Sequence, residues 1–285
     1  MKNYILKSCL IILSILFFNI NSFAQDKTSI TNSQWANLHL YKGVNQRSGP
    51  YSFDDTYVEL EFGGRYEFFD LYGYVDFIDA LNSSSSDKHG DNNYFVDIEP
   101  RISIDYLLNK DLSYGALKEL YFAFDIYYAD VPSQSTTNGL KILWMGLGSD
   151  IDIPWLGKSG VNFYTRYIKD NYDASNEGKF DGYVAHINWF KPLHFFSENR
   201  FISFQGYADY EFGSNLDNDI FERTYRTSDS FQSYMGLWLH EKKWALGYGL
   251  KAYKNMTQWK DNQDLFAKKT DTTGFAHYFN VAYKF

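Results

Sequence analysis

Residues 94–106 read Tyr-Phe-Val-Asp-Ile-Glu-Pro-Arg-Ile-Ser-Ile-Asp-Tyr, and their side chains alternate between two characters. One set of alternate positions is mostly apolar, and the other carries the charges of Asp97, Glu99, Arg101 and Asp105. Because successive side chains of a β-strand point to opposite faces, this stretch predicts a strand with one apolar and one polar face. Pro100 lies inside it and has no backbone N–H to donate, so we expect a bulge there.

The same alternation recurs along the chain, and no stretch with the period of a helix competes with it. It predicts twelve strands, near residues 35–42, 54–65, 67–78, 94–106, 119–130, 139–151, 160–170, 179–191, 201–212, 229–240, 243–254 and 274–285. Typical strands of globular proteins have only about five or six residues. These segments instead suit the roughly 9–11 residues with which a tilted strand crosses a bilayer. No linker rich in Pro and Gly divides them, so we expect one domain.

The connections between these segments alternate in length. Those after odd-numbered strands are mostly long and polar, such as 79–93, 213–228 and 255–273, and those after even-numbered strands are mostly short. Long loops on one side, short turns on the other and an even number of strands are typical of outer-membrane barrels. Aromatic residues near strand ends predict girdles at the two membrane interfaces: Trp35, Tyr128, Trp144, Trp155, Trp189 and Trp244.

The last segment supports the same interpretation. It alternates apolar and polar residues and ends on Phe285, which resembles the C-terminal signal that the outer-membrane assembly machinery reads. We therefore predict an all-β fold, a single closed antiparallel transmembrane β-barrel of twelve strands. It would lie in the outer membrane of a Gram-negative bacterium, in contact with outer-membrane lipid.

The N-terminal residues 1–24 have the features of a cleaved signal peptide. Lys2 and Lys7 precede an apolar run at residues 10–18, which is too short to span a membrane, and small residues precede a cleavage site after Ala24. The mature barrel would then comprise residues 25–285. The single cysteine, Cys9, falls within the signal, so the mature chain offers no disulfide and no thiol nucleophile.

The remaining composition argues against several classes of function. Removing Lys2 and Lys7 leaves 25 basic against 35 acidic residues, a net charge of −10, which disfavours a nucleic-acid partner. The six histidines show no metal-type spacing, and no motif indicates a cofactor. Ser214 lies in no Gly-x-Ser-x-Gly motif and has no histidine near it in sequence, so we expect no enzyme.

Lipid forces the apolar face of each strand outward, so the polar faces are expected to line the lumen. These faces carry eleven acidic and four basic residues, interleaved with tyrosines and phenylalanines. Aromatic rings stack on nucleobases, worth about 1–3 kcal/mol per base, and carboxylates accept hydrogen bonds from sugar hydroxyls. A net acidic lumen disfavours anions. Two other interpretations remain open: the charges at Glu99, Arg101 and Asp105 pair to fill the wall, or the tyrosines serve packing.

Several collinear stretches from about residue 47 onward resemble the nucleoside-specific channel family of Gram-negative outer membranes, the Tsx family. The more specific of them are Glu99-Pro100-Arg101 and Met145-Gly146-Leu147-Gly148. The resemblance implies a twelve-stranded monomeric barrel with a narrow pore that passes nucleosides and deoxynucleosides by diffusion. One position departs from the family pattern, because Ser48 in Arg47-Ser48-Gly49-Pro50 stands where the family has a phenylalanine tied to nucleoside recognition.

We therefore interpret the chain as a passive outer-membrane channel for nucleosides. The residues expected along the solute path are Arg47 at the mouth and Tyr57, Glu59, Glu61, Tyr72, Asp76, Glu99, Arg101, Asp105, Tyr121 and Asp125 in the lumen. The alternatives are a channel for another small neutral or cationic solute, a barrel enzyme, and a surface receptor with a plugged lumen.

Overall fold

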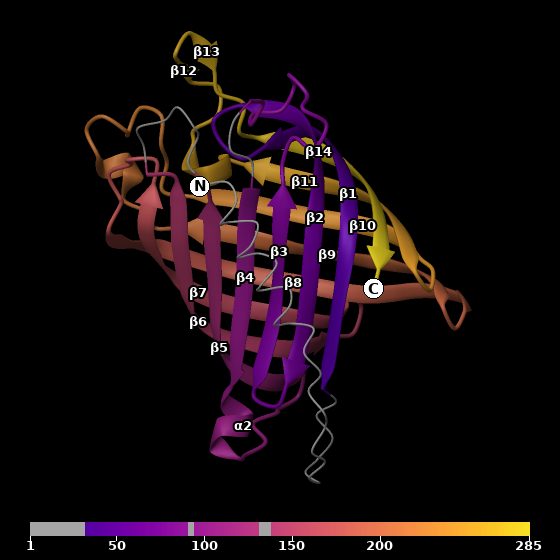
Figure 1. Ribbon diagram of the computed structural model, residues 1–285. Coiled ribbons are helices and arrows are strands. Elements are labelled where there is room, and N and C mark those ends of the chain that lie inside the picture. The colour runs from indigo at the N-terminus through magenta and orange to yellow at the C-terminus, as the bar shows by residue number, and fades with distance from the viewer. Residues whose placement is uncertain (1–31, 91–93, 131–137) are drawn as a thin grey trace, which may run out of the picture. The chain divides into compact units, whose positions relative to one another are not determined.

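The computed structural model describes residues 32–90, 94–130 and 138–285, so the predicted signal peptide, residues 1–24, lies outside the described residues. Twelve strands close into one antiparallel barrel (Figure 1). They are β1 (Ser33–Arg47), β2 (Ser52–Tyr66), β3 (Phe69–Phe77), β4 (Tyr94–Ser103), β5 (Leu117–Ala129), β6 (Leu140–Ile153), β7 (Gly157–Asn171), β8 (Lys179–Ser197), β9 (Arg200–Phe212), β10 (Ser230–His240), β11 (Trp244–Lys254) and β14 (Gly274–Lys284). Strand β1 closes the barrel against β14. The predicted fold is confirmed.

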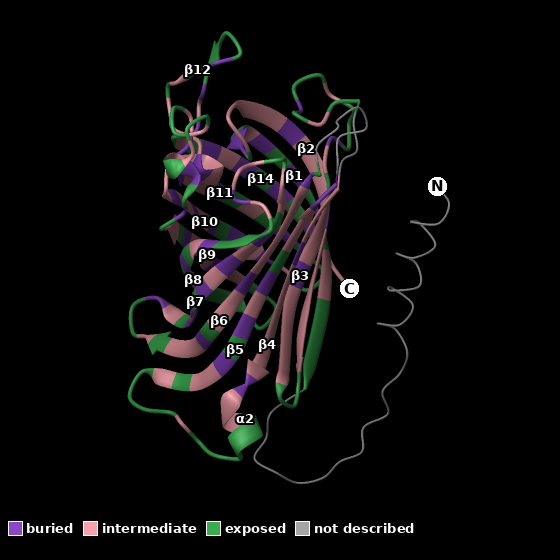
Figure 2. Ribbon diagram, turned by 90° about the vertical axis from the view of Figure 1, so that its left-hand side faces the viewer, coloured by how far each residue is buried: buried purple, intermediate pink, exposed green. Residues whose placement is uncertain are grey.

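The barrel is apolar outside and polar inside. Leu40, Leu147 and Phe279 expose 48%, 57% and 52% of their surface, whereas Asp125 and Asp209 expose 1% and 3%. Because side chains alternate across each strand, the two sets lie on opposite faces of one wall. Figure 2 shows the burial changing in bands along the strands. A soluble protein would bury the first set and expose the second. The outer face therefore suits lipid, as the sequence predicts.

The two ends of the barrel differ in their connections. One end, here called the loop end, carries 78–93, 213–229 and 255–273, and the last of these folds back as the hairpin β12 (Asp264–Leu265) and β13 (Lys268–Lys269). This end also holds the 3-10 helices η1 (Leu216–Asn218) and η2 (Met256–Gln258). The opposite end, here called the turn end, has the short connections 67–68, 154–156, 198–199 and 241–243. Two connections break the predicted alternation, because 48–51 is short and 104–116 is long.

The connection 104–116 contains the short helix α2 (Ile104–Leu108), so the predicted strand through residue 106 is wrong. Ser103 caps this helix, because its hydroxyl accepts a hydrogen bond from the backbone N–H of Tyr106 at 3.1 Å. Asp105 consequently leaves the barrel wall, and its carboxylate accepts hydrogen bonds from the backbone N–H groups of Leu112 and Leu120. The prediction that Asp105 lines the lumen is therefore wrong. None of the helices in the described part of the chain has the length and apolar character needed to span a bilayer.

The expected bulge at Pro100 is also wrong. Ile98 pairs with Ile126 and Arg101 with Ala123, so both strands advance equally across the proline and no extra residue is inserted. On the other side of β4, Pro100 keeps its place opposite Leu71. A missing N–H interrupts the ladder here without changing its register. At Pro192 in β8, by contrast, the register with β9 shifts between Pro192 and His194.

Candidate solute path

Five acidic side chains from four neighbouring strands gather inside the barrel, on the loop-end side of its middle. We call them the carboxylate cluster: Glu59 of β2, Asp76 of β3, Asp97 and Glu99 of β4, and Asp125 of β5. Carboxylate oxygens of Asp97, Glu99 and Asp125 lie within 4.8 Å of one another. Within the described ranges, no Lys, Arg or His nitrogen lies within 4.0 Å of a cluster oxygen. The carboxyl groups of the cluster therefore have no ion-pair partner among the described residues.

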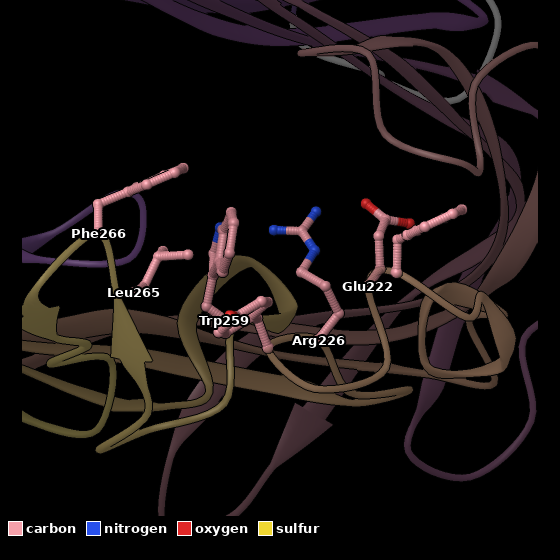
Figure 3. A pocket seen from close by; sticks show the side chains of 7 residues that line it. Glu222, Arg226, Trp259, Leu265 and Phe266 are labelled. Atoms are coloured by element: carbon pink, nitrogen blue, oxygen red, sulfur yellow. The ribbon is translucent and has the colours of Figure 1, made fainter.

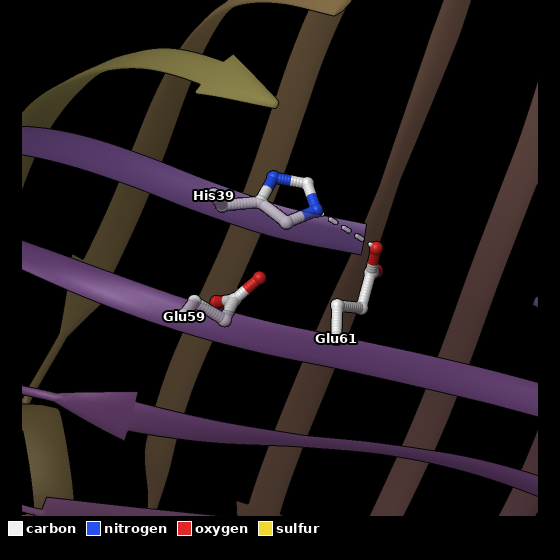
Figure 4. A group of neighbouring side chains, drawn as sticks. All are labelled: His39, Glu59 and Glu61. Carbon is white, nitrogen blue, oxygen red and sulfur yellow. Dashed lines mark hydrogen bonds and ion pairs between the residues drawn. The ribbon is translucent and has the colours of Figure 1, made fainter. Parts of the chain in front are cut away.

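Glu61 lies beside the cluster but has its own partners (Figure 4). Its carboxylate is 3.1 Å from Nε2 of His39, and it accepts hydrogen bonds from Asn37 at 2.9 Å and from the Tyr72 hydroxyl at 3.1 Å. Glu59 has a different surrounding, because its hydrogen-bonding partner is the carboxyl group of Asp76, opposite it on β3. Glu61 and Tyr72 therefore stabilise the wall, while Glu59 belongs to the carboxylate cluster.

In a second charged group, near the turn end, each arginine is paired with a carboxylate. We call it the turn-end network: Arg65, Asp70, Arg101, Ser103, Glu119, Tyr121 and Asp150. Arg65 binds both oxygens of Glu119 at 2.5 and 2.7 Å. Arg101 reaches across to Asp70 at 2.5 Å and Asp150 at 2.8 Å.

Tyr121 ties the two arginines of this network together. Its hydroxyl accepts a hydrogen bond from Arg65 at 2.8 Å and donates one to Asp150 at 2.8 Å, and its ring lies 4.2 Å from the Arg101 guanidinium. Tyr121 exposes none of its surface. Arg101 and Tyr121 are thus occupied by wall contacts. Of the two interpretations left open for Arg101, pairing within the wall is the one observed, but its partners are Asp70 and Asp150 in place of Glu99 and Asp105.

Aromatic side chains follow the inner wall in two arcs, within which neighbouring ring centroids are 4.7 to 6.5 Å apart. One arc crosses β3 to β8: Tyr72, Tyr74, Phe95, Tyr127, Trp144, Tyr164 and His186. The other crosses β9, β10, β14, β1 and β2: Tyr207, Tyr234, Tyr278, Tyr41 and Tyr57. Tyr74 and Tyr127 stand opposite Asp97 on the two flanking strands. Rings and carboxylates therefore lie at the same level of the lumen.

Some of these residues were missed by the sequence reasoning. Trp144 was assigned to an interface girdle, but it exposes only 3% of its surface and belongs to the first arc. His39 and Tyr41 alternate with the apolar Leu38 and Leu40, so the period-two signal for the interior was present there. His186, which lies 2.6 Å from Asp209, comes from a segment whose alternation is weaker.

Arg47 ends β1 at the loop end, where it anchors the last loop. Its guanidinium donates to the Asp271 carboxylate at 2.7 Å and to backbone oxygens of Asn45 and Phe275. Burial tends to raise the pKa of Asp271, but hydrogen bonds from Ser52 and Arg47 and the Arg47 charge hold that pKa below its ordinary value. Ser48, which departs from the family pattern, donates its hydroxyl to Asp87 of the loop 78–93 at 3.1 Å. Arg47 therefore lies at the mouth as a structural anchor.

In the part of the chain that the structure describes, two groups of side chains bring metal-ligating atoms together. His39, Glu59 and Glu61 form one, and Asp97, Glu99 and Asp125 form the other, with ligand atoms within 4.8 Å of one another in each. Hard cations such as Ca²⁺ take about 6–8 oxygen ligands, which is more than either group supplies. The expectation of no metal site stays a prediction.

A closed barrel with a lipid-compatible exterior, an acidic and aromatic interior and long loops at one end belongs to the class of outer-membrane channels. Within that class the comparison with known proteins is specific. A family model described as nucleoside-specific channel-forming protein, Tsx, matches residues 30–285. The chain belongs to this family, which confirms the resemblance found in the sequence.

Individual relatives cover nearly the whole chain. Outer membrane protein OmpK of Vibrio parahaemolyticus is 38% identical over 252 residues, which is 88% of each chain. The nucleoside-specific channel-forming protein Tsx of Klebsiella aerogenes is 32% identical over 301 residues, which is 100% of each chain. Among solved structures, the NanC porin has a TM-score of 0.48 at 9% identity and covers 87% of this chain and 100% of that one.

Proposed function

We propose that this barrel is a passive outer-membrane channel for nucleosides, whose path follows the carboxylate cluster and the two aromatic arcs. Family membership supports a channel, and relatives of about 30% identity are named for nucleosides. The observation that supports this path most directly is that Tyr74 and Tyr127 flank Asp97 at one level of the lumen. A stacking surface and a hydrogen-bond acceptor lie side by side there, which is what the two halves of a nucleoside require.

The chemistry of passage follows from these groups. A base has a π-face that stacks on aromatic rings, with about 1–3 kcal/mol per base in single-strand binding proteins. Sugar hydroxyls donate hydrogen bonds to Glu59, Asp76, Asp97, Glu99 or Asp125. Along each aromatic arc, a base would meet one ring after another on which it can stack. Each contact stays weak enough to release the solute, which conduction requires.

The same cluster accounts for discrimination against anions. Neighbouring carboxylates that lack a basic partner repel a phosphate group, and in a narrow passage water screens this repulsion poorly. Three of the four basic groups expected inside the barrel pair with other carboxylates, and the fourth, Lys251, lies 5.4 Å from the ring centres of Tyr207 and Tyr253. Arg65 and Arg101 are held in the turn-end network, and Arg166 lies 2.9 Å from Glu211. A nucleotide should therefore enter much less readily than its nucleoside.

The predicted path residues divide accordingly. We assign Tyr57, Glu59, Asp76, Glu99 and Asp125 to the solute path. Glu61, Tyr72, Arg101 and Tyr121 support its wall, and Arg47 holds the mouth. We also propose that the barrel works as a monomer, contacts outer-membrane lipid with its apolar face, and meets the assembly machinery through the strand ending at Phe285.

We do not propose an enzyme, because Ser214 and Ser203, the two serines considered as nucleophiles, do not have the surroundings that a catalytic serine needs. Ser214 donates its hydroxyl to Asp181 at 2.5 Å. Ser203 lies 2.8 Å from Nε2 of His240, but the other ring nitrogen of that histidine faces Lys284 at 3.2 Å. A catalytic histidine needs an acid in that place. Ser203 also exposes none of its surface, so a substrate has no access to it.

A channel for small cations is the second candidate function. The unpaired carboxylate cluster favours it, and the relative named OmpK carries no substrate in its name. Swelling of liposomes that contain the purified protein separates the two. We expect faster swelling with adenosine or thymidine than with AMP or with a sugar of similar size. Swelling no faster with the nucleosides than with the sugar, but slower with AMP, would remove the nucleoside proposal and leave the cation channel.

A further inference from the structure

A cavity of about 250 Å³ opens at the loop end, between the loops 213–229 and 255–273 (Figure 3). It is lined by Phe221, Glu222, Tyr225, Arg226, Trp259, Leu265 and Phe266. Pockets for drug-sized ligands usually measure about 300–1,000 Å³, so this one suits a small ring system. Four of its seven lining residues are aromatic, and one carries a buried positive charge.

That charge, the guanidinium of Arg226, has no hydrogen-bond acceptor among the described residues. The side chain exposes only 4% of its surface, and its Nε is buried without a partner. Within residues 32–90, 94–130 and 138–285 it makes no hydrogen bond and no ion pair. Burial lowers the pKa of Arg226 to about 10, so it stays charged at neutral pH. Leaving a buried charged donor unsatisfied is costly, so the structure supplies donors for an acceptor that a ligand would bring.

The surroundings hold this guanidinium in place. It lies 4.1 Å from the centre of the Trp259 ring. Backbone hydrogen bonds from Thr227 to Gln258 and from Lys260 to Tyr225 join the two loops on either side of this pair. Glu222 also lines the cavity, but its carboxylate is bound by the backbone N–H and hydroxyl of Ser175. The donors are therefore preorganised beside an aromatic wall.

A fixed guanidinium fork recognises particular base edges. Arginine binds O6 and N7 of a 6-oxopurine with two hydrogen bonds, because both atoms are acceptors. Adenine presents an amino donor in place of O6, so the same fork meets a donor there. We propose that this cavity is an outer docking site for the 6-oxopurine ring of guanosine and inosine, read by Arg226 and stacked on the apolar walls. The inference rests on the proposed nucleoside function and adds a base preference to it.

Inosine and adenosine are a matched pair of probes, because their purines differ at this edge. Nucleoside-induced block of single channels in planar bilayers measures their affinity, with nucleoside added at the loop end. For the wild-type protein we expect inosine to block with about tenfold higher affinity than adenosine, from the 1–3 kcal/mol that a bidentate pair contributes. Equal affinities would overturn the docking site while leaving the nucleoside channel intact. No block by either nucleoside would count against both proposals.

Two variants of Arg226 separate the effect of the planar guanidinium from the effect of its positive charge. Arg226→Met and Arg226→Lys should each bring inosine to within about twofold of adenosine, because lysine keeps the charge without the planar fork. Trp259→Leu should weaken both nucleosides, about tenfold. The control is Arg223→Met, the same change at an exposed arginine of the same loop, which should leave the inosine preference unchanged.

An unaltered preference in both Arg226 variants would overturn the assignment. So would relief of inosine block by equimolar inorganic phosphate, which would mark the cavity as a general anion site. If Arg226→Met fails to fold, Arg226→Lys and the wild-type comparison still decide the matter.

Discussion

The carboxylate cluster and the turn-end network are both charged groups on the inner face of the same barrel, yet they differ in what their charges meet. In the network every arginine has at least one carboxylate within 3 Å. In the cluster no basic nitrogen of the described residues comes within 4.0 Å. Charge inside a barrel therefore has two uses. Paired charge holds strands together, and we propose that the unpaired carboxylates act on a solute.

The largest effect should come from breaking the paired group. Arg101→Ala leaves Asp70 and Asp150 without their common partner. Removing one member of a buried ion pair costs about 3–5 kcal/mol. Since Asp150 is 38% exposed, we expect the lower end, about 3 kcal/mol. Unfolding by urea in detergent measures it. An Arg101→Ala barrel as stable as the wild type would contradict the structural role of the network.

The next effect should come from neutralising the unpaired group. Asp97→Asn with Asp125→Asn removes two of three neighbouring carboxylates and relieves their repulsion, so stability should not fall. Cation selectivity should fall several-fold. The reversal potential in a KCl gradient measures this ratio, and Asp150→Asn in the network serves as the matched control. Unchanged selectivity in the double variant would show that the cluster does not face the conduction path.

A smaller effect separates stacking from hydrogen bonding at the cluster. The Tyr127 hydroxyl donates to Asp125 at 2.6 Å, and its ring lies 4.7 Å from Trp144. Tyr127→Leu should weaken nucleoside block about tenfold, because the stacking surface is lost. Tyr127→Phe keeps that surface and should change the block by less than threefold. Equal losses in the two variants would mean that the hydroxyl, and not the ring, carries the contact.

The smallest effect concerns an ion pair that is partly open to water, Arg47 with Asp271. The Asp271 side chain is 45% exposed, so its pair should contribute below about 1 kcal/mol. Because the folded pKa of Asp271 is lowered, this contribution is full above the ordinary aspartate pKa and is lost as the pH falls through the lowered value.

Protease cleavage of the loop 255–273, followed from pH 7 downward with an acid-active protease, tests this. It should accelerate only below about pH 4. Asp271→Asn should cleave at the faster rate throughout. A wild-type rate that rises near pH 6 would assign the effect to another group.

Strand β4 shows how far the sequence carried these conclusions. Alternation over residues 94–103 places Asp97, Glu99 and Arg101 on the inner face, and the structure agrees. It misleads at Asp105, because Ser103 can cap a helix and alternation alone does not reveal this. The alternation pattern also could not predict the partners of Arg101. Asp70 is its register partner on β3, and Asp150 lies on β6, so both depend on the register between strands.

The unpaired state of the cluster was likewise hidden in the sequence. A list of inward-facing residues contains eleven acids and four bases, but it does not say which acids the bases reach. Two of the predicted bases are used near the turn end, and Arg166 is used on Glu211. The fold could be predicted from the sequence because lipid imposes a period-two pattern of apolar side chains. The site could be predicted only in part, because three-dimensional proximity decides which acidic and basic side chains pair.

The central claim is that a nucleoside passes between the aromatic arcs and the carboxylate cluster. A crystal of the protein soaked with 5-iodouridine tests it directly, because the iodine marks the base by its anomalous scattering. We predict an anomalous peak inside the barrel, with the ring stacked near Tyr127 or Trp144 and sugar hydroxyls within hydrogen-bond distance of Asp97, Glu99 or Asp125. A lumen without a peak at a concentration that blocks the channel would contradict the account.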